Sequence, residues 1–184
     1  GLYASPRAWW MFRAMGHEQV FVLAGGLPAW LEAGHEVSDH YLPEPGDGDF
    51  VANEQPGFIV DAATVLQALD DPGTVVLDAR SAGRFCGLEP EPRPGVREGH
   101  MPGAKNLPCG QVLDGYSLKP VAELRELLGG LAAPEQTVIS SCGSGITACI
   151  LTLAAATAGY EKLAVYDGSW AEWGLPSKLP VVTE

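Results

Sequence analysis

An alternation of short apolar runs with amphipathic stretches is the feature that most constrains how this chain can fold. The predicted strands are apolar runs bounded by turns, at residues 74–80, 136–141 and 162–167, with a shorter one within 103–108. The predicted helices have apolar residues at helical spacing, at residues 61–70, 120–131, 147–159 and 170–174. Strands that alternate with helices are typical of a largely parallel sheet with helices on both faces. We therefore predict an α/β fold whose ligands bind beyond the carboxyl ends of the strands.

A stretch near the beginning of the chain is similar to a stretch near its end. "GHEQVFVLAGGLPAW" (16–30) and "GYEKLAVYDGSWAEW" (159–173) share Gly, Glu, Val, Gly and Trp at the same relative positions. Each copy indicates a helix that ends at glycine, a buried strand (20–23 in the first copy), a glycine turn and a helix with tryptophan. Upstream, "SPRAWWMFRAM" predicts a helix with Ser5 as its N-cap and Pro6 in its first turn. The matching order of elements favours an internal duplication.

The duplication divides the chain into three parts. We expect residues 1–37 to be the C-terminal remnant of a first domain, the rest of which would lie upstream of Gly1. Residues 38–57 are predicted to be an interdomain linker, because "HYLPEPGDGDFVANEQPG" is rich in Pro, Gly and acidic residues. Residues 58–184 are predicted to form a complete second domain that carries the chemistry.

Charge and cysteine content exclude several classes of protein. The formal net charge of −12 argues against nucleic-acid binding, because phosphate contacts need clustered Lys and Arg. No apolar run is long enough to span a bilayer, so no membrane partner is expected. Cys86, Cys109, Cys142 and Cys149 have neither metal-ligand spacing nor the density of a disulfide scaffold. We therefore expect free thiols in a reducing compartment. The cytoplasm is the predicted compartment, with mitochondria as the alternative. Neither a metal nor a cofactor is expected.

The stretch "SSCGSGITA" (140–148) places a cysteine between a predicted strand and a predicted helix. Cys142 therefore lies at the edge of the sheet where such folds bind ligands. Gly143 and Gly145 allow the loop to turn several N–H groups toward one point, and a helix N-terminus adds partial positive charge. Such surroundings stabilise a thiolate and predict a cysteine nucleophile. The alternative interpretation is a glycine turn with a buried free cysteine.

Four segments together resemble the tandem rhodanese-like sulfurtransferases. In chain order they are "RAWWMFRAMGHEQVFVLAGGLPAW", "GRFCGLEPEPRPGVREGHMPGAKNLP", "CGSGIT" and "YDGSWAEWG". The resemblance implies a rhodanese-like domain with a mostly parallel sheet, preceded by the C-terminal remnant of a second copy. It also implies that Cys142 attacks the sulfur of 3-mercaptopyruvate, releases pyruvate and carries a persulfide. That sulfur would then pass to cyanide, a thiol or thioredoxin.

The resemblance also assigns roles to residues around Cys142. Arg84 and Arg93 match two arginines that hold the carboxylate and carbonyl oxygens of the substrate, and a planar guanidinium suits a bidentate grip on a carboxylate. Ser144 matches a serine proposed to relay a proton to the departing enolate. The N–H groups of the loop would stabilise the anionic persulfide, at Gly143, Gly145, Ile146 and Thr147. The His and Asp acid–base partners of the family belong to its first domain, so we expect low activity from this chain alone.

Three alternatives concern the substrate and the activity. Rhodaneses proper have basic residues after the cysteine, suited to dianionic thiosulfate, whereas Gly143 and Ser144 are neutral. Thiosulfate sulfurtransferase is therefore the second hypothesis. Rhodanese-fold phosphatases have an arginine where this chain has Ala148, which argues against phosphatase activity. The third interpretation is an inactive fragment that serves as a rhodanese-like binding module.

Several other residues with reactive or polar side chains are predicted to be structural. Asp78 and Arg80 are expected to pair at a strand end, and His100 is expected to order its loop. Cys86 lies two residues from Arg84, at the border of the predicted site. Cys149 and Cys109 are expected to pack in the core. Trp9 and Trp10 are expected to pack at a domain interface.

Overall fold

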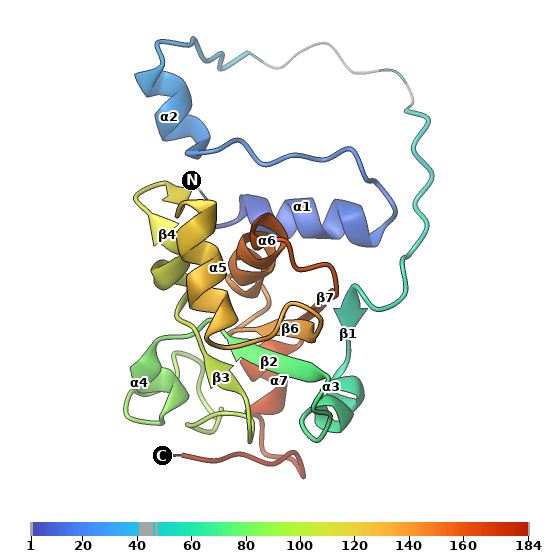
Figure 1. The fold of residues 1–184 in the computed structure, drawn as a ribbon, viewed down its shortest axis with the longest axis vertical. Coiled ribbons are helices and arrows are strands. Elements are labelled where there is room, and N and C mark those ends of the chain that lie inside the picture. The colour runs from blue at the N-terminus through green and yellow to red at the C-terminus, as the bar shows by residue number, and fades with distance from the viewer. Residues whose placement is uncertain (1, 41–45, 47, 184) are drawn as a thin grey trace.

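The structure is a computed structural model that describes residues 2–40, 46 and 48–183. Its centre is a five-stranded parallel sheet of strand order β1-β7-β6-β2-β3 (Figure 1). The strands are β1 (Ile59–Val60), β2 (Thr74–Asp78), β3 (Lys105–Asn106), β6 (Thr137–Ser141) and β7 (Leu163–Tyr166). A separate antiparallel hairpin consists of β4 (Leu113–Asp114) and β5 (Ser117–Leu118). The predicted α/β class with a parallel sheet is confirmed.

Helices cover both faces of this sheet. The first face packs against α1 (Ser5–Ala14), α5 (Val121–Gly129) and α6 (Ala148–Ala158). The second face packs against α3 (Ala62–Ala68) and α7 (Ser169–Trp173). The remaining helices are α2 (Gly26–Glu32), α4 (Ala82–Phe85) and a short 3-10 helix, η1 (Cys109–Val112).

The apolar strands divide their side chains between two cores. In β6, Val138 belongs to the core under α6 and the next residue, Ile139, belongs to the core under α3 and α7. In β2, Leu77 and Val76 are divided in the same way. Side chains of a strand alternate between the faces of its sheet, so a strand that is covered on both faces is apolar at every position. This is why the central strands are recognisable as continuous apolar runs.

Helix α1 packs directly against α6, far along the chain (Figure 1). Trp9 and Trp10 are 7% and 3% exposed and belong to the same core as α6. The Trp10 indole N–H donates to the carbonyl oxygen of Phe58 over 3.0 Å, and the two rings stack with centroids 4.8 Å apart. The tryptophan pair thus anchors the N-terminal helix to the beginning of the sheet domain.

Two expectations for the N-terminal part are wrong. Residues 20–23 do not form a strand, because no strand among the described residues lies beside them to pair with their backbone. Val20 and Val22 pack against the core, whereas Phe21 is 87% exposed. Ser5 is the first residue of α1 and not its N-cap, since the residue before it occupies the cap position without a side-chain bond.

The predicted linker, residues 38–57, falls partly outside the described residues, and its described part has neither helix nor strand. Its last residues return to the end of α1. The Asn53 N–H donates to the carbonyl oxygen of Met15 over 2.9 Å, and the Gln55 N–H donates to that of Ala14 over 2.7 Å. The segment is therefore tied to α1 by its backbone before it enters β1.

The helices and strands predicted for the sheet domain are present, with small shifts in their ends. Helix α3 begins after Asp61, whose carboxylate accepts from the Thr64 N–H over 2.8 Å. Helix α6 ends at Gly159, whose φ of +103° favours glycine. The elements of the sheet domain that the sequence analysis did not predict are all short, namely β1, α4, η1 and the β4–β5 hairpin.

Candidate active site

Cys142 lies immediately after β6, at the carboxyl edge of the sheet. Its backbone N–H donates to the Ser169 hydroxyl over 3.1 Å, and this hydroxyl donates to the carbonyl oxygen of Tyr166 over 2.8 Å. Ser169 is fully buried and has a φ of +50°, an uncommon conformation for a residue with a side chain. A residue held in this region points to a functional constraint. Ser169 therefore fixes the start of the Cys142 loop, a role that sequence reasoning missed although it lies in the "YDGSWAEWG" motif.

The carbonyl groups of the Cys142 loop are held by neighbouring elements. The N–H groups of Trp170 and Ala171, at the beginning of α7, donate to the carbonyl oxygens of Cys142 and Gly143 over 2.9 and 3.0 Å. One loop N–H faces the sulfur, because the Ser144 N–H donates to the Cys142 Sγ over 3.4 Å. With the carbonyl groups turned away, the loop presents an N–H to the thiol, as expected for a site that stabilises a sulfur anion.

The middle of the loop requires glycine. Gly145 has a φ of +77°, and a Cβ placed on it would lie 2.7 Å from Asp167 Oδ1 and 2.9 Å from Arg7 Nη1. Arg7, on α1, donates to the carbonyl oxygen of Gly145 over 3.3 Å and also pairs with Asp167. The loop is thus packed between the end of β7 and the N-terminal helix. The sequence indicated a turn here but gave no sign of Arg7.

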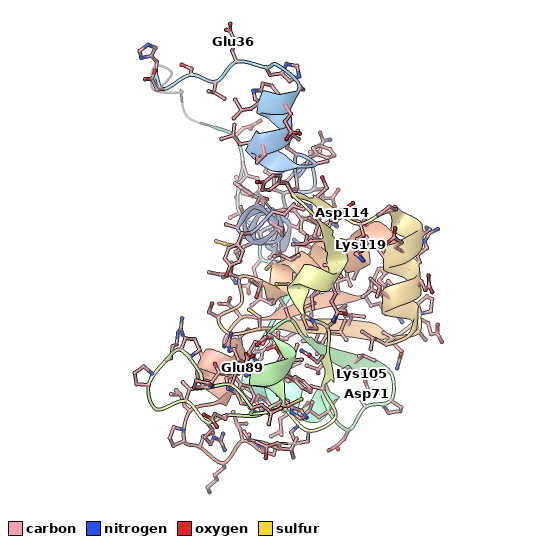
Figure 2. The ribbon with its side chains drawn as sticks, turned by 90° about the vertical axis from the view of Figure 1, so that its left-hand side faces the viewer. Glu36, Asp71, Glu89, Lys105, Asp114 and Lys119 are labelled. Carbon is pink, nitrogen blue, oxygen red and sulfur yellow. The ribbon has the colours of Figure 1, made fainter. Side chains whose placement is uncertain are left out.

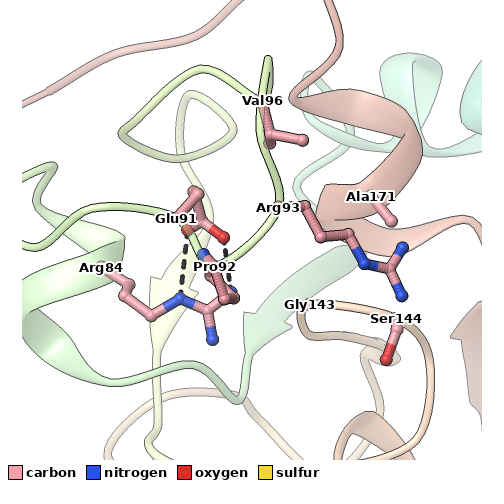
Figure 3. Close-up of a pocket in the computed structure, with 8 residues that line it drawn as sticks. All are labelled: Arg84, Glu91, Pro92, Arg93, Val96, Gly143, Ser144 and Ala171. Atoms are coloured by element: carbon pink, nitrogen blue, oxygen red, sulfur yellow. Dashed lines mark hydrogen bonds and ion pairs between the residues drawn. The ribbon is translucent and has the colours of Figure 1, made fainter.

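A pocket of about 210 Å³ opens beside the loop (Figure 3). It is lined by Arg84, Glu91, Pro92, Arg93, Val96, Gly143, Ser144 and Ala171. Arg93 is exposed, and its guanidinium points toward the Ser144 side of the loop in the close-up view. Cys142 is 1% exposed and does not line the pocket, so the two residues after it form that part of the wall. The structure therefore brings Arg84, Arg93 and Ser144 together, with the thiol behind the loop.

Arg84 comes from α4 and is held by an acidic neighbour. Its Nε and Nη2 donate to the two carboxylate oxygens of Glu91, over 3.2 and 2.5 Å. A Cβ on Gly143 would lie 3.1 Å from Arg84 Nη2 and 3.7 Å from Nη1. One edge of the guanidinium therefore faces Glu91 and the other faces the Cys142 loop. Sequence reasoning identified the arginine but not the carboxylate that orients it.

Behind this pair lies a buried arginine. Arg80 has a fully buried side chain and binds both oxygens of Asp78, as the predicted structural pair requires. It also donates to Glu91 over 2.7 Å and to the carbonyl oxygen of Gly99 over 2.8 Å, and its guanidinium stacks on Trp170 at 4.1 Å. Asp78, Arg80, Glu91 and Arg84 thus form one chain of alternating charge that ends at the pocket; we call it the charge chain.

The three other cysteines and His100 lie outside the pocket. Cys149 is fully buried in α6, and its burial raises the pKa of the thiol from 9.0 to about 12. Cys109 is partly buried, and this burial, together with the charge of Cys142, raises the pKa of its thiol. Cys86 follows α4 without lining the pocket. His100 stacks on Phe85 and its Nδ1 lies 2.8 Å from the Phe85 carbonyl oxygen, so it orders its loop.

Two further classes of site can be examined in the part of the chain that the structure describes. None of its helices combines the length and the apolar character that a bilayer crossing requires. Within the same described residues, no group of three or more His, Cys, Asp or Glu side chains is arranged to hold a metal ion.

The rhodanese-like domain family matches residues 61–175, which include the Cys142 loop and the pocket. Because this match covers more than half of the chain, the chain belongs to the rhodanese-like domain family.

Individual relatives are similar over nearly the whole chain. The chain is 42% identical over 179 residues to the 3-mercaptopyruvate sulfurtransferase of Rattus norvegicus, a match that covers 94% of this chain and 59% of the relative. It is 40% identical over 178 residues to the thiosulfate sulfurtransferase of Cricetulus griseus, again with 94% and 59% covered. The chain therefore spans about three fifths of the length of these relatives.

A solved structure has the same fold. The crystal structure of SseA from Escherichia coli, a 3-mercaptopyruvate sulfotransferase with the rhodanese fold, matches with a TM-score of 0.79 and 36% identity. This match covers 92% of the present chain and 63% of the other. Sequence and structure thus agree on the family.

Proposed function

We propose that this protein is a sulfurtransferase that moves sulfur from 3-mercaptopyruvate to a thiophilic acceptor through a persulfide on Cys142. The observation that carries the proposal is the pocket, where Arg84 and Arg93 face the loop that follows the cysteine. Two guanidinium groups beside a loop whose Ser144 N–H donates to the Cys142 sulfur suit a small acid that carries sulfur. The names of the relatives at about 40% identity point to the same chemistry.

The proposed first step transfers one sulfur atom without an external oxidant. The Cys142 thiolate attacks the substrate sulfur, an S–S bond forms, and the C–S bond of the substrate breaks. The bonding electrons leave with the carbon as the enolate of pyruvate, which takes a proton to become pyruvate. Ser144 lines the pocket and is the residue that we propose to pass this proton. The cysteine is left as a persulfide, stabilised by the loop N–H groups from Gly143 to Thr147.

The two arginines are proposed to bind the acid end of the donor. A carboxylate and the adjacent carbonyl oxygen of 3-mercaptopyruvate can accept from the loop-facing edge of Arg84 and from Arg93. This grip places the substrate sulfur toward the loop, because the pocket is bounded there by Gly143 and Ser144. In the second step a nucleophile such as cyanide, a thiol or a thioredoxin-type protein takes the outer sulfur and regenerates the thiolate.

Mass spectrometry of the intact chain and of its Cys142 peptide tests this proposal. After incubation with 3-mercaptopyruvate we expect one added sulfur on Cys142 and an equal amount of pyruvate. Cys142→Ser should abolish both products, while Cys149→Ala should keep them. Pyruvate without a persulfide, or persulfide in equal amounts on another cysteine, contradicts the assignment.

Thiosulfate is the second candidate donor, since a relative of equal coverage and nearly equal identity is a thiosulfate sulfurtransferase. The described pocket has three ionisable side chains, Arg84, Arg93 and Glu91, and no lysine. One excess positive charge suits a singly charged donor better than a dianion. We therefore place 3-mercaptopyruvate first, and rates of persulfide formation with both donors distinguish the two.

We further propose that residues 1–37 belong to a second rhodanese-like unit. The likeness of 16–30 to 159–173 supports this, as do the exposed apolar side chains Phe21, Leu27 and Leu31, at 87%, 54% and 50%. The part of the relatives that this chain does not match would cover these side chains. Adding that part as a separate polypeptide should give a complex on gel filtration and a higher turnover; the absence of both contradicts the proposal.

A further inference from the structure

A carboxylate stands inside a pocket that is proposed to bind an anion. The Glu91 side chain is only 5% exposed, yet it is part of the pocket lining. Its Oε1 accepts from Arg80 over 2.7 Å and from Arg84 over 3.2 Å, and its Oε2 accepts from Arg84 over 2.5 Å. A negative charge next to an anion site opposes binding, so its presence there requires a reason.

The buried arginine does not supply that reason. Arg80 already binds both oxygens of Asp78, donates to the carbonyl oxygen of Gly99 and stacks on Trp170. Asp78 therefore neutralises Arg80 by itself. The charge of Glu91 remains to be balanced by Arg84, which leaves Arg93 as the excess positive charge among the described residues that line the pocket.

Glu91 also determines where Arg84 points. The carboxylate occupies the Nε–Nη2 edge, as the dashed lines in Figure 3 show, and it fixes the plane of the guanidinium. The Nη1–Nη2 edge is then the one nearest Gly143. A planar fork with one edge occupied offers a single bidentate edge to a ligand.

We propose that Glu91 selects the charge of the sulfur donor. By pairing with Arg84 it leaves the pocket with one excess positive charge and one aimed guanidinium edge, which favours a singly charged α-keto acid over a dianion. The inference rests on the proposed function and extends it to donor specificity. Glu91 is a positioning residue, because it acts through Arg84 rather than on the donor sulfur.

The test compares single-turnover persulfide formation on Cys142 with 3-mercaptopyruvate and with thiosulfate, followed by mass spectrometry. Glu91→Gln keeps the shape of the side chain and removes its charge. We expect the ratio of the rate constants, thiosulfate over 3-mercaptopyruvate, to rise about tenfold or more, since a nearby unit charge acts strongly on a dianion. The dependence of each rate on donor concentration separates binding from chemistry, and the change should appear mainly in the binding constant.

Glu89→Gln is the matched control. Glu89, labelled in Figure 2, lies two residues away and does not line the pocket. Its carboxylate accepts from the Ser81 hydroxyl over 2.7 Å. This substitution changes the net charge of the chain by the same amount, so a general field effect would change the ratio equally in both variants. An equal ratio in the two variants, or an unchanged ratio in Glu91→Gln, overturns the inference.

A second variant, Glu91→Asp, separates the effect of the Glu91 charge from its effect on the orientation of Arg84. It also provides a test if Glu91→Gln does not fold. Glu91→Asp keeps the charge on a shorter side chain, so the preference for 3-mercaptopyruvate should remain while both rates fall. A ratio in Glu91→Asp that shifts toward thiosulfate as far as in Glu91→Gln contradicts the charge argument. The chain without substitutions distinguishes a failure of the proposed function from a failure of the inference about Glu91. If it forms no persulfide with either donor, the proposed function fails; if it does and the ratios do not move, only the inference about Glu91 fails.

Discussion

Arg7 donates to the carbonyl oxygen of Gly145 over 3.3 Å, which connects the first helix of the chain to the loop that follows Cys142. The same guanidinium pairs with Asp167 at the end of β7. The hydrogen bond to Asp167 raises the pKa of Arg7, so the arginine remains charged throughout the working range of pH. The N-terminal segment therefore contributes a contact to the proposed active site.

Removing the charge of Arg7 should loosen the loop. For Arg7→Gln we expect slower persulfide formation on Cys142 and a loss of about 0.5–1.5 kcal/mol in the free energy of unfolding, since the ion pair is partly exposed. Urea unfolding and single-turnover mass spectrometry measure the two effects. Arg13→Gln is the control on the same helix, because Arg13 lies over the Trp9 ring at 5.3 Å and away from the loop. An equal loss of rate in both variants contradicts the positioning role.

Arg84 and Arg93 should affect donor binding through the shape of the guanidinium. Arg84→Lys and Arg93→Lys keep the charge but lose the fork, so kcat/KM for 3-mercaptopyruvate should fall by the equivalent of about 1–3 kcal/mol each. Arg84→Lys should also weaken the contact with Glu91 and therefore cost more. The effect is measured by steady-state kinetics of the chain together with the added part of its relatives, and circular dichroism checks that each variant is folded. Unchanged constants in both variants rule out the role.

Cys149 should not react with alkylating reagents at neutral pH. Its burial raises the pKa of the thiol to about 12, so the thiolate is scarce until the solution is strongly alkaline. The neutral thiol stabilises the fold fully below pH 9, and this contribution is lost as the pH rises toward 12. Iodoacetamide labelling followed by peptide mapping between pH 7 and 9 is the measurement. Labelling of Cys149 in the folded chain within this pH range contradicts the raised pKa. The variant Cys149→Ala serves to identify the peptide that contains Cys149.

A positive charge in the loop should change the preferred donor. Ser144→Lys adds a cation to the pocket wall, and we expect the ratio of thiosulfate to 3-mercaptopyruvate rates to rise by about tenfold. Gly143 is a poorer position for this change, since any Cβ there would lie 3.1 Å from Arg84 Nη2 and the guanidinium would have to shift by a few tenths of an ångström. Leu88→Lys, at a side chain that is 80% exposed and outside the pocket, is the charge control. If Ser144→Lys and Leu88→Lys change the ratio equally, loop charge does not determine specificity.

The sheet domain could be predicted from the sequence because its signals are local. Continuous apolar runs fixed the central strands, and Gly159 marked the end of α6 by a conformation that other residues avoid. The position of Cys142 followed from the rule that parallel sheets bind ligands at their carboxyl edge. Residues 20–23 have the same apolar character but no neighbouring strand among the described residues, and pairing is a property of the surroundings rather than of the segment.

The contacts that orient the site could not be predicted, since they join residues that are distant in the chain. Glu91 was one of three glutamates in a stretch dense in proline, and nothing local indicated that Arg80 and Arg84 would both reach it. Arg7 reaches Gly145 only because α1 packs on α6. Ser169 was visible in a motif, but its bond to the backbone of Cys142 depends on how α7 meets the end of β6.

The charge chain has a genetic consequence. Its four members alternate in sign from the buried Asp78 to the pocket wall, and replacing Arg84 by a neutral residue leaves the buried Glu91 without the partner that balances its charge. A second substitution that removes the stranded charge should then restore the stability of the fold more readily than a change elsewhere, whereas donor binding through Arg84 stays lost. In a selection for folded, soluble expression of Arg84→Met, we therefore expect suppressors at Glu91 rather than at the exposed Glu89.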